Sequence, residues 1–375
     1  MDLPQKDPIW IGGPAALQRM VDELLSQTVI GVDTESNSLY AYHERVCLIQ
    51  FSVNGNDYLV DPLAIKDLSA LGQVFASPQI EKVFHAAEYD LICLKRDFGF
   101  TFAHLFDTML AARILGRTGL GLGTLLKQEF GIEVDKRLQR ANWARRPLSA
   151  EMMAYARMDT HYLIALEKIL GQELVRAGRW ELAQEDFARL CAVAAGVHEN
   201  NGGNCWRVAG VQDLTPRQAA VFVELCAFRE ERARAMDQPP FRVLTNQTLL
   251  DLAQRMPRKR NELSQVMGLS AKLIDRYGTG LLEAVERGMV GPPAYRPPAA
   301  RPSDAVLARL ENLRTWRKLM AREMGVESDI ILPRDLMEQI AERNPRSMEE
   351  LEEIIGDLPW RLSHFGRQIL QALQS

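Results

Sequence analysis

Short apolar runs and one long helical pattern organise the first half of the chain. Residues 29–32 (Val-Ile-Gly-Val) form an unbroken apolar run, which is typical of a buried strand. Residues 45–52 and 57–61 resemble two further strands, and residues 82–84 resemble the end of another. Residues 151–166 instead carry apolar side chains at helical spacing. The apolar character of residues 29–32 is in keeping with a central strand of a sheet that is covered on both faces.

The second half of the chain contains an internal repeat. Residues after about 210 match one another at an offset of 88 positions, without gaps over most of the length. Both copies have the pattern of short amphipathic helices separated by proline and glycine, which predicts two small all-helical domains. The matched positions include Leu225 with Leu313, Phe228 with Trp316, Leu244 with Leu332, Pro257 with Pro345, and Gly268 with Gly356.

These patterns divide the 375 residues into three predicted domains, at 1–205, 210–290 and 303–375. The length agrees with two or three domains. Residues 291–302 (Gly-Pro-Pro-Ala-Tyr-Arg-Pro-Pro-Ala-Ala-Arg-Pro) predict a stiff, proline-rich linker between the two helical copies.

Composition indicates a cytoplasmic protein. The opening residues lack the basic region and apolar core of a secretory signal, and no apolar run approaches the length of a membrane span. We therefore expect no membrane partner, and no obligate protein partner is indicated. The five cysteines form no Cys-x-x-Cys pair, so reduced thiols are expected rather than zinc ligands or disulfides: Cys47, Cys93, Cys191, Cys205 and Cys226.

Charge is distributed unevenly between the two helical copies. The whole chain carries a formal charge of −4, which by itself does not favour a nucleic-acid binder. Residues 210–290, however, hold 12 Lys or Arg and 10 Asp or Glu, whereas residues 301–375 hold 11 and 13. The first copy also contains the basic run Arg258, Lys259 and Arg260, so it is the better candidate for phosphate contact. The alternative for this run is a solvated helix end.

Acidic residues follow the central strand and lie on two predicted helices. Asp33 and Glu35 are two positions apart, so on an extended strand both side chains leave the same face. Asp90 lies in the first turns of a helix, and Tyr155 and Asp159 lie one helical turn apart. Each motif has an ordinary alternative: a turn after a strand, a helix-start acid, or a surface tyrosine beside a solvated aspartate.

Two neighbouring residues fit structural roles better. His85 stands at a strand end, where a structural hydrogen bond is more common than metal ligation. Asp107 has the position of a helix N-cap.

The ordered combination of these motifs resembles the DEDD superfamily of 3′→5′ exonucleases. Ala154 occupies the position that holds histidine in the sibling subclass, which favours the subclass with tyrosine. Residues 120–126 and 142–149 resemble the ribonuclease D family in particular, and the two helical copies resemble helicase-and-ribonuclease-D C-terminal (HRDC) domains. The resemblance implies an α/β ribonuclease H-like exonuclease domain with a mixed sheet, followed by two all-α HRDC-like domains.

The resemblance also implies a chemistry. Asp33, Glu35, Asp90 and Asp159 would hold two divalent ions, Mg²⁺ or Mn²⁺, and Tyr155 would orient the attacking water or help to deprotonate it. The substrate would be RNA with a free 3′ end, notably tRNA precursors, and the product a 5′-mononucleotide. Residues named as candidates for RNA binding are Trp143, which could stack on a base or pack in the core, and Arg145 and Arg146, which could hold a phosphate.

Two other readings remain open from sequence alone. A non-catalytic RNA-binding protein could keep the same fold, although the intact acidic set argues against it. A DNA exonuclease of the Werner type would share the catalytic core, and no residue in the sequence identifies a reader of the RNA 2′-hydroxyl group.

Overall fold

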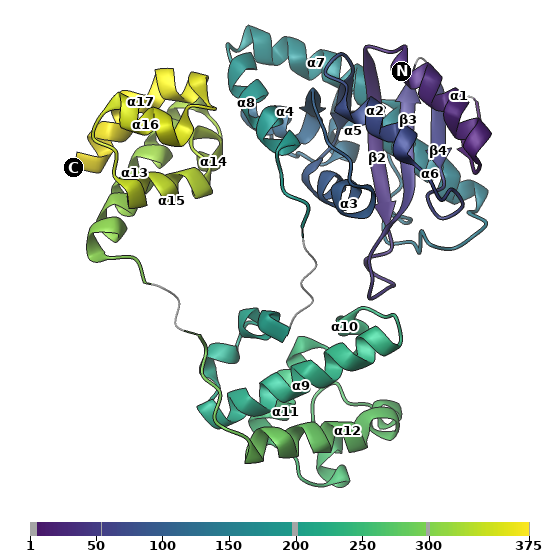
Figure 1. Cartoon of the computed structure of the whole chain (residues 1–375), viewed down its shortest axis with the longest axis vertical. Coiled ribbons are helices and arrows are strands. Elements are labelled where there is room, and N and C mark those ends of the chain that lie inside the picture. The colour runs from purple at the N-terminus through teal and green to yellow at the C-terminus, as the bar shows by residue number, and fades with distance from the viewer. Residues whose placement is uncertain (1–5, 54, 197–201, 298–300, 375) are drawn as a thin grey trace. The chain divides into compact units, whose positions relative to one another are not determined.

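The computed structural model describes residues 6–53, 55–196, 202–297 and 301–374 (Figure 1). The chain forms two compact units. One comprises Met1–Ser36, Val46–Gly196 and Arg301–Ser375, and the other comprises Asn37–Arg45 and Val197–Ala300. The second helical copy therefore belongs to the same unit as the α/β domain. The predicted domain boundaries stay predictions, and residues 197–201 and 298–300, which lie near two of them, are outside the described ranges.

A six-stranded mixed sheet forms the centre of the α/β domain. Its strand order is β1-β4-β3-β2-β5-β6, so the predicted strand at 29–32 is central, as expected. β3 runs antiparallel to both of its neighbours, and the other pairings are parallel. The strands are β1 (Ile9–Ile11), β2 (Val29–Ser36), β3 (Val46–Val53), β4 (Asn56–Val60), β5 (Glu81–Phe84) and β6 (Leu105–Asp107).

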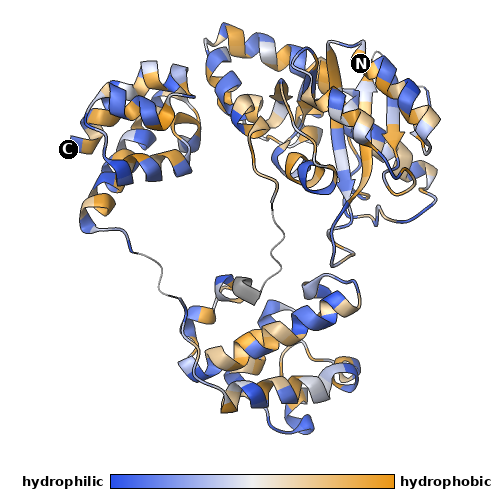
Figure 2. Ribbon diagram, in the orientation of Figure 1, coloured by the Kyte–Doolittle hydropathy of each residue, from blue (hydrophilic) through white to orange (hydrophobic). Residues whose placement is uncertain are grey.

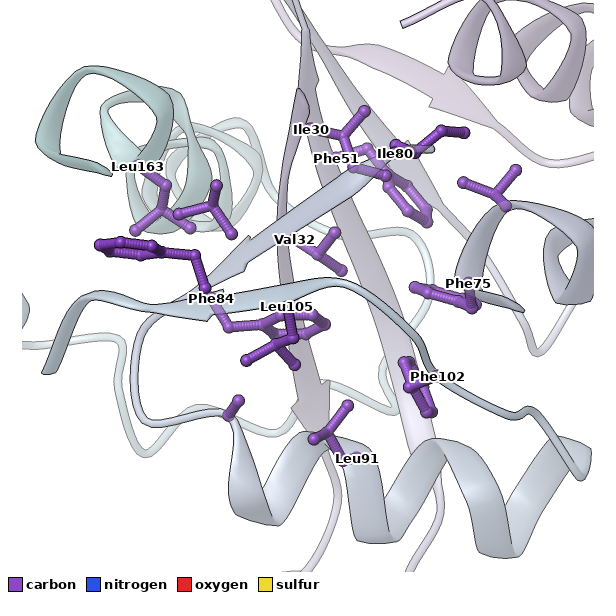
Figure 3. Close-up of a cluster of buried hydrophobic side chains, with 14 of the residues drawn as sticks. Ile30, Val32, Phe51, Phe75, Ile80, Phe84, Leu91, Phe102, Leu105 and Leu163 are labelled. Atoms are coloured by element: carbon purple, nitrogen blue, oxygen red, sulfur yellow. The ribbon is translucent and has the colours of Figure 1, made fainter. Parts of the chain in front are cut away.

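Helices cover both faces of this sheet. Successive residues of β2 point to opposite faces and so contact different helices. Ile30 and Val32 point to one face, where they join Phe51, Phe75 and Leu91 in the main hydrophobic core (Figure 3). The helices of this domain are α1 (Pro14–Leu25), α2 (Ser69–Ala76), α3 (Glu88–Phe98), α4 (Thr108–Ile114), α5 (Leu122–Phe130), α6 (Ala150–His161), α7 (Leu163–Arg176) and α8 (Trp180–Cys191).

The other face of β2 lies against α6 and the start of α7. Gly31 is buried there, and a Cβ atom added to it would lie only 2.9 Å from the carbonyl oxygen of Thr160 and 3.4 Å from Leu163. A glycine at this position therefore lets the end of α6 approach the strand closely. The close approach holds α6 against the face of the sheet that carries the acidic side chains.

The helical repeat is confirmed element by element. Four helices and one 3₁₀ helix of the first copy begin 88 residues before their counterparts in the second. Met256 and Asn344, also 88 apart, both adopt a left-handed backbone conformation at a helix end. Apolar stripes run along the helices of each copy (Figure 2). The first copy contains α9 (Pro216–Ala235), α10 (Pro240–Val243), α11 (Asn246–Arg255), η3 (Arg260–Gln265) and α12 (Ala271–Val290), preceded by η1 (Gly202–Arg207) and η2 (Val211–Asp213), and the second contains α13 (Asp304–Met324), α14 (Ser328–Ile331), α15 (Arg334–Arg343), α16 (Met348–Ile355) and α17 (Pro359–Gln374).

A buried arginine joins the second copy to the α/β domain within their common unit. Arg361 on α17 is fully buried, and its guanidinium lies 2.9 Å from Glu185 and 2.8 Å from Asp186, both on α8. The same guanidinium donates hydrogen bonds to the carbonyl oxygens of Ile330 and Ile331. The second copy is thus anchored to α8 by buried charges as well as by apolar contact.

Exposed ion pairs add to this contact. Arg113 on α4 lies 2.6 Å from both Glu327 and Asp329. Across the described ranges, none of the helices combines the length and the apolar character that crossing a membrane requires.

Candidate active site

Two acidic side chains leave the same face of the central strand β2. Asp33 pairs with Gln50 of β3 in the sheet register, and Glu35 follows two positions later. The Nε2 atom of Gln50 lies 3.4 Å from a carboxylate oxygen of Asp33. The side-chain oxygen of the fully buried Gln50 has no hydrogen-bond partner among the described residues. Carboxylate and amide oxygens are the ligand types that hard divalent cations take.

A third carboxylate, that of Asp90, comes from α3. It is buried, and it accepts a short hydrogen bond from the hydroxyl group of Thr34 on β2. Asp90 stands in the first turn of α3, as predicted. The hydrogen bond ties this helix start to the strand that carries Asp33 and Glu35.

The turn before α3 is fixed by Asp107, which caps α4 as predicted. Its carboxylate accepts hydrogen bonds from the backbone of Met109 and from that of Ala86 and Ala87. His85 makes the structural hydrogen bond that the sequence favoured, with 2.9 Å between its Nδ1 and the hydroxyl oxygen of Thr108. These bonds hold the β5–α3 turn and so set where α3 begins.

Helix α6 supplies the fourth carboxylate and the tyrosine. The side chain of Ser149 caps its first turn by accepting a hydrogen bond from the backbone N–H of Met152. Tyr155 and Asp159 lie four positions apart on this helix, as predicted, and therefore share a face. Asp33, Glu35 and Asp159 are all within electrostatic range of the Tyr155 phenol. The structure thus places the phenol within electrostatic range of three of the four proposed acids, and the roles of all five residues stay predictions.

The electrostatics of the four acids are those of a crowded, poorly hydrated group. Burial, followed by repulsion from the other three acids, raises the pKa of Asp33 well above its ordinary value. Burial, followed by repulsion from Asp159 and Asp90, does the same to Glu35. The pKa of both Asp90 and Asp159 is raised to about 7, mainly by burial. Three of them nevertheless keep part of their surface exposed, so water and substrate can reach them: Asp33, Glu35 and Asp159.

These four residues fit a divalent metal centre by the chemistry of their donor atoms. Within the described ranges, no three candidate ligands are yet gathered closely enough to enclose an ion. Uncompensated carboxylates repel one another, and bound cations are what would let them approach.

Tyr155 is neutral in this environment. Burial, and then the negative charges of Asp159, Glu35 and Asp33, raise the pKa of its phenol well above the ordinary value. A phenol that keeps its proton can donate one hydrogen bond and accept another. The neutral phenol of Tyr155 is therefore better suited to orienting a water molecule than to removing a proton from it.

The structure changes the interpretation of two candidate RNA-binding residues. Trp143 is 1 % exposed, so its ring is out of reach of a nucleic-acid base, and the alternative of core packing is correct. Arg146 is engaged in a paired contact with the buried Asp61, so it is not a free phosphate ligand. Arg145 is exposed and remains a candidate.

The basic run in the first helical copy is at the surface. Arg258, Lys259 and Arg260 are all exposed, although Arg260 forms an ion pair with Asp275. Arg258 and Arg260 line a hollow of about 550 Å³ whose other walls include apolar residues of α12. These residues remain candidates for phosphate contact.

One contributor was missed at the sequence level. Gln50 interrupts the apolar run of β3, and a polar residue inside such a run was a signal that it faces a polar site. Its partner across the sheet, Asp33, could not be identified without the register.

Comparison with known proteins adds a family to this geometry. Residues 8–175 match the family model described as 3′-5′ exonuclease, and residues 218–285 and 306–373 each match the HRDC domain. Ribonuclease D from Pseudomonas paraeruginosa is 29% identical over 98% of this chain and 97% of its own. Ribonuclease D from Desulfotalea psychrophila is 31% identical over 73% of each chain. The crystal structure of Escherichia coli RNase D superposes with a TM-score of 0.71 at 24% identity, covering 98% of this chain and 99% of that one.

Proposed function

This chain belongs to the ribonuclease D family of 3′→5′ exonucleases, and from that premise we propose that it hydrolyses RNA stepwise from the 3′ end, releasing 5′-mononucleotides. One observation carries the proposal. Asp33 and Glu35 on β2, Asp90 on α3 and Asp159 on α6 lie within electrostatic range of one another, and the charges of three of them also raise the pKa of the Tyr155 phenol.

Each residue has a role in this proposal. Asp33, Glu35, Asp90 and Asp159 would hold two divalent cations, Mg²⁺ or Mn²⁺, which supply an activated water and offset charge on the phosphate when bound. Tyr155, as a neutral phenol, would orient the attacking water in line with the terminal phosphodiester bond. The water oxygen would bond to phosphorus as the bond from phosphorus to the 3′-oxygen breaks, and the 3′-oxygen would take up a proton, leaving a 5′-mononucleotide and an RNA shorter by one residue.

For the physiological substrate we propose the 3′ ends of tRNA precursors and other small structured RNAs. Two HRDC domains accompany the catalytic domain, and the similar Escherichia coli protein is described as an exoribonuclease involved in structured RNA processing. Two such modules would suit a substrate that is bound at a distance from the 3′ end that is cut.

Matched RNA and DNA oligomers of one sequence test the proposal. The 5′-labelled RNA should shorten one nucleotide at a time with Mg²⁺ or Mn²⁺, and excess chelator should stop the reaction. A copy blocked by a 3′-phosphate is the control for direction. Faster hydrolysis of the DNA would indicate a DNA exonuclease, and RNA binding without hydrolysis under either ion would indicate a binding protein.

Tyr155→Phe should lower the rate constant for RNA hydrolysis while RNA affinity and metal affinity change little. The substitution keeps the ring and removes the hydroxyl group, and a single orienting or acid–base group is typically worth about 10²–10⁴-fold. Single-turnover hydrolysis, with RNA and Mn²⁺ titrated separately, measures the three quantities. Wild-type turnover in this variant would show that Tyr155 serves packing alone.

Replacing Arg258, Lys259 and Arg260 together with serine should weaken RNA binding and make it less sensitive to salt. If each side chain neutralises one phosphate, the slope of log affinity against log salt should become shallower by about 2, at roughly 0.7 per single-strand contact. Filter binding of a tRNA precursor across a salt series measures this slope.

The matched control removes three exposed basic residues from the second copy, Lys318, Arg322 and Arg367. It changes the net charge of the chain equally. An equal loss of salt sensitivity in the control would mean that total charge, rather than the basic run of the first copy, governs binding.

A further inference from the structure

A buried tryptophan packs against the proposed catalytic tyrosine. The rings of Trp143 and Tyr155 have centroids 5.9 Å apart and planes inclined at 36°. Trp143 belongs to a small hydrophobic cluster, separate from the main core, that lies between β3, β4 and α6. Its other buried members are Cys47, Leu48, Leu59, Leu148 and Ala156. One side of the Tyr155 ring is therefore supported by a side chain that cannot itself move into solvent.

An arginine clamp holds the segment that carries this tryptophan. The guanidinium of Arg146 donates to both carboxylate oxygens of Asp61, at 2.7 and 2.8 Å. It also donates to the carbonyl oxygens of Trp143, at 2.7 Å, and Cys47, at 2.6 Å. Asp61 follows the end of β4 and Cys47 lies in β3, so the clamp fixes the tryptophan's backbone to two strands of the sheet.

The geometry points to a positioning role: we propose that Trp143, held by the Arg146–Asp61 clamp, sets the orientation of the Tyr155 phenol at the scissile phosphate. This inference rests on the proposed hydrolysis. It assigns to Trp143 and Arg146 a role in the rate of the reaction without any contact with RNA.

The physical reason is the freedom of a tyrosine side chain. A ring on a helix can occupy more than one rotamer, and Tyr155 is only partly buried. A neighbour fixed by packing removes the unproductive rotamers before substrate binds. Misplacing a reacting group by about 1 Å can cost on the order of 100-fold in rate. The bidentate fork of Arg146 is suited to this task because it constrains direction as well as distance.

A double-mutant cycle tests the inference. The four proteins are wild type, Trp143→Phe, Tyr155→Phe and the combination. Trp143→Phe should lower the single-turnover rate constant by about 10- to 100-fold, with the KM for RNA nearly unchanged. In the Tyr155→Phe background the same change should cost no more than about twofold, because the group that it positions is gone.

Trp180→Phe is the matched control. Trp180 packs on Phe106, at 6.3 Å between ring centroids, and belongs to the periphery of the main core. Its effect should be the same factor in both backgrounds. If Trp143→Phe melts near the assay temperature, Arg146→Lys replaces it in the cycle, since lysine keeps the charge and loses the fork.

The outcomes separate the inference from the proposed function. If Tyr155→Phe lowers the rate and Trp143→Phe or Arg146→Lys lowers it by the same factor in both backgrounds, these residues are merely structural and the inference is wrong. Full activity of Tyr155→Phe would overturn the role proposed for the tyrosine, and the positioning role with it. Loss in the single variants with no further loss in the combination supports both.

Discussion

Asp33→Asn, or Asp159→Asn, should lower RNA hydrolysis by on the order of 10³-fold or more, with the fold intact, because each removes a charged ligand from a site that must hold two cations. Single-turnover assays with saturating Mg²⁺, together with circular dichroism, measure the two effects. Asp135→Asn is the matched control, since Asp135 is an exposed acid near Tyr155 that pairs with Arg137. Turnover within about tenfold of wild type in either variant would remove that residue from the metal site.

Asp33→Asn should also stabilise the protein when no divalent ion is present. The carboxyl pKa values are raised in the folded state, to about 7 for Asp90 and Asp159, so the folded protein binds more protons than the unfolded chain between about pH 4 and 7. The metal-free protein should therefore lose stability as pH rises through this range. Asp33→Asn should flatten that loss, and thermal melts with chelator at pH 5 and pH 8 compare the two proteins.

The central part of this site could be predicted because its signals are local. The apolar run at 29–32 is long enough to indicate a strand, and strand alternation then places Asp33 and Glu35 on one face. Helical spacing does the same for Tyr155 and Asp159. The repeat in the second half was readable because it depends on comparing the chain with itself.

Other features depend on contacts between distant segments and left little local signal. β1 and β6 have three residues each, which is too short for a periodic pattern to be recognised. Trp143 had two possible roles, stacking on a base or packing in the core. Only its burial in the structure shows that it packs in the core. Arg146 was predicted to hold a phosphate because its actual partner, Asp61, lies 85 positions away in the sequence and could not be identified from it.

The anchoring of the second helical copy also had a sequence signal that needed the structure to interpret it. Arg361 occupies the position that holds Leu273 in the first copy, 88 residues earlier. A charge at a position where the first copy has leucine implies a partner that only the second copy contacts. That partner is the pair Glu185 and Asp186 on α8. The two copies share a fold, and the second copy belongs to the same compact unit as the catalytic domain.

Arg361→Leu should therefore destabilise the unit that contains the catalytic domain, although it restores the residue of the first copy. Burial raises the pKa of Glu185 and Asp186, and the charge of Arg361 offsets only part of that cost. Removing one partner of a buried ion pair leaves uncompensated charge and typically costs about 3–5 kcal/mol. Urea unfolding of the full chain, followed by circular dichroism, should show a lower midpoint for the transition of this unit.

Arg367→Leu is the matched control, because Arg367 is exposed on the same helix, α17. It should change the midpoint little, since surface substitutions usually stay within about 0.5 kcal/mol. Adding Glu185→Gln and Asp186→Asn to Arg361→Leu should recover part of the lost stability, because the unpaired charges are removed along with their partner. An equal loss from Arg361→Leu and Arg367→Leu would contradict the anchoring role. If Arg361→Leu alone is costly, deleting residues 301–375 would strip a buried surface from the catalytic domain as well as remove an RNA-binding module, so truncation would not measure RNA binding alone.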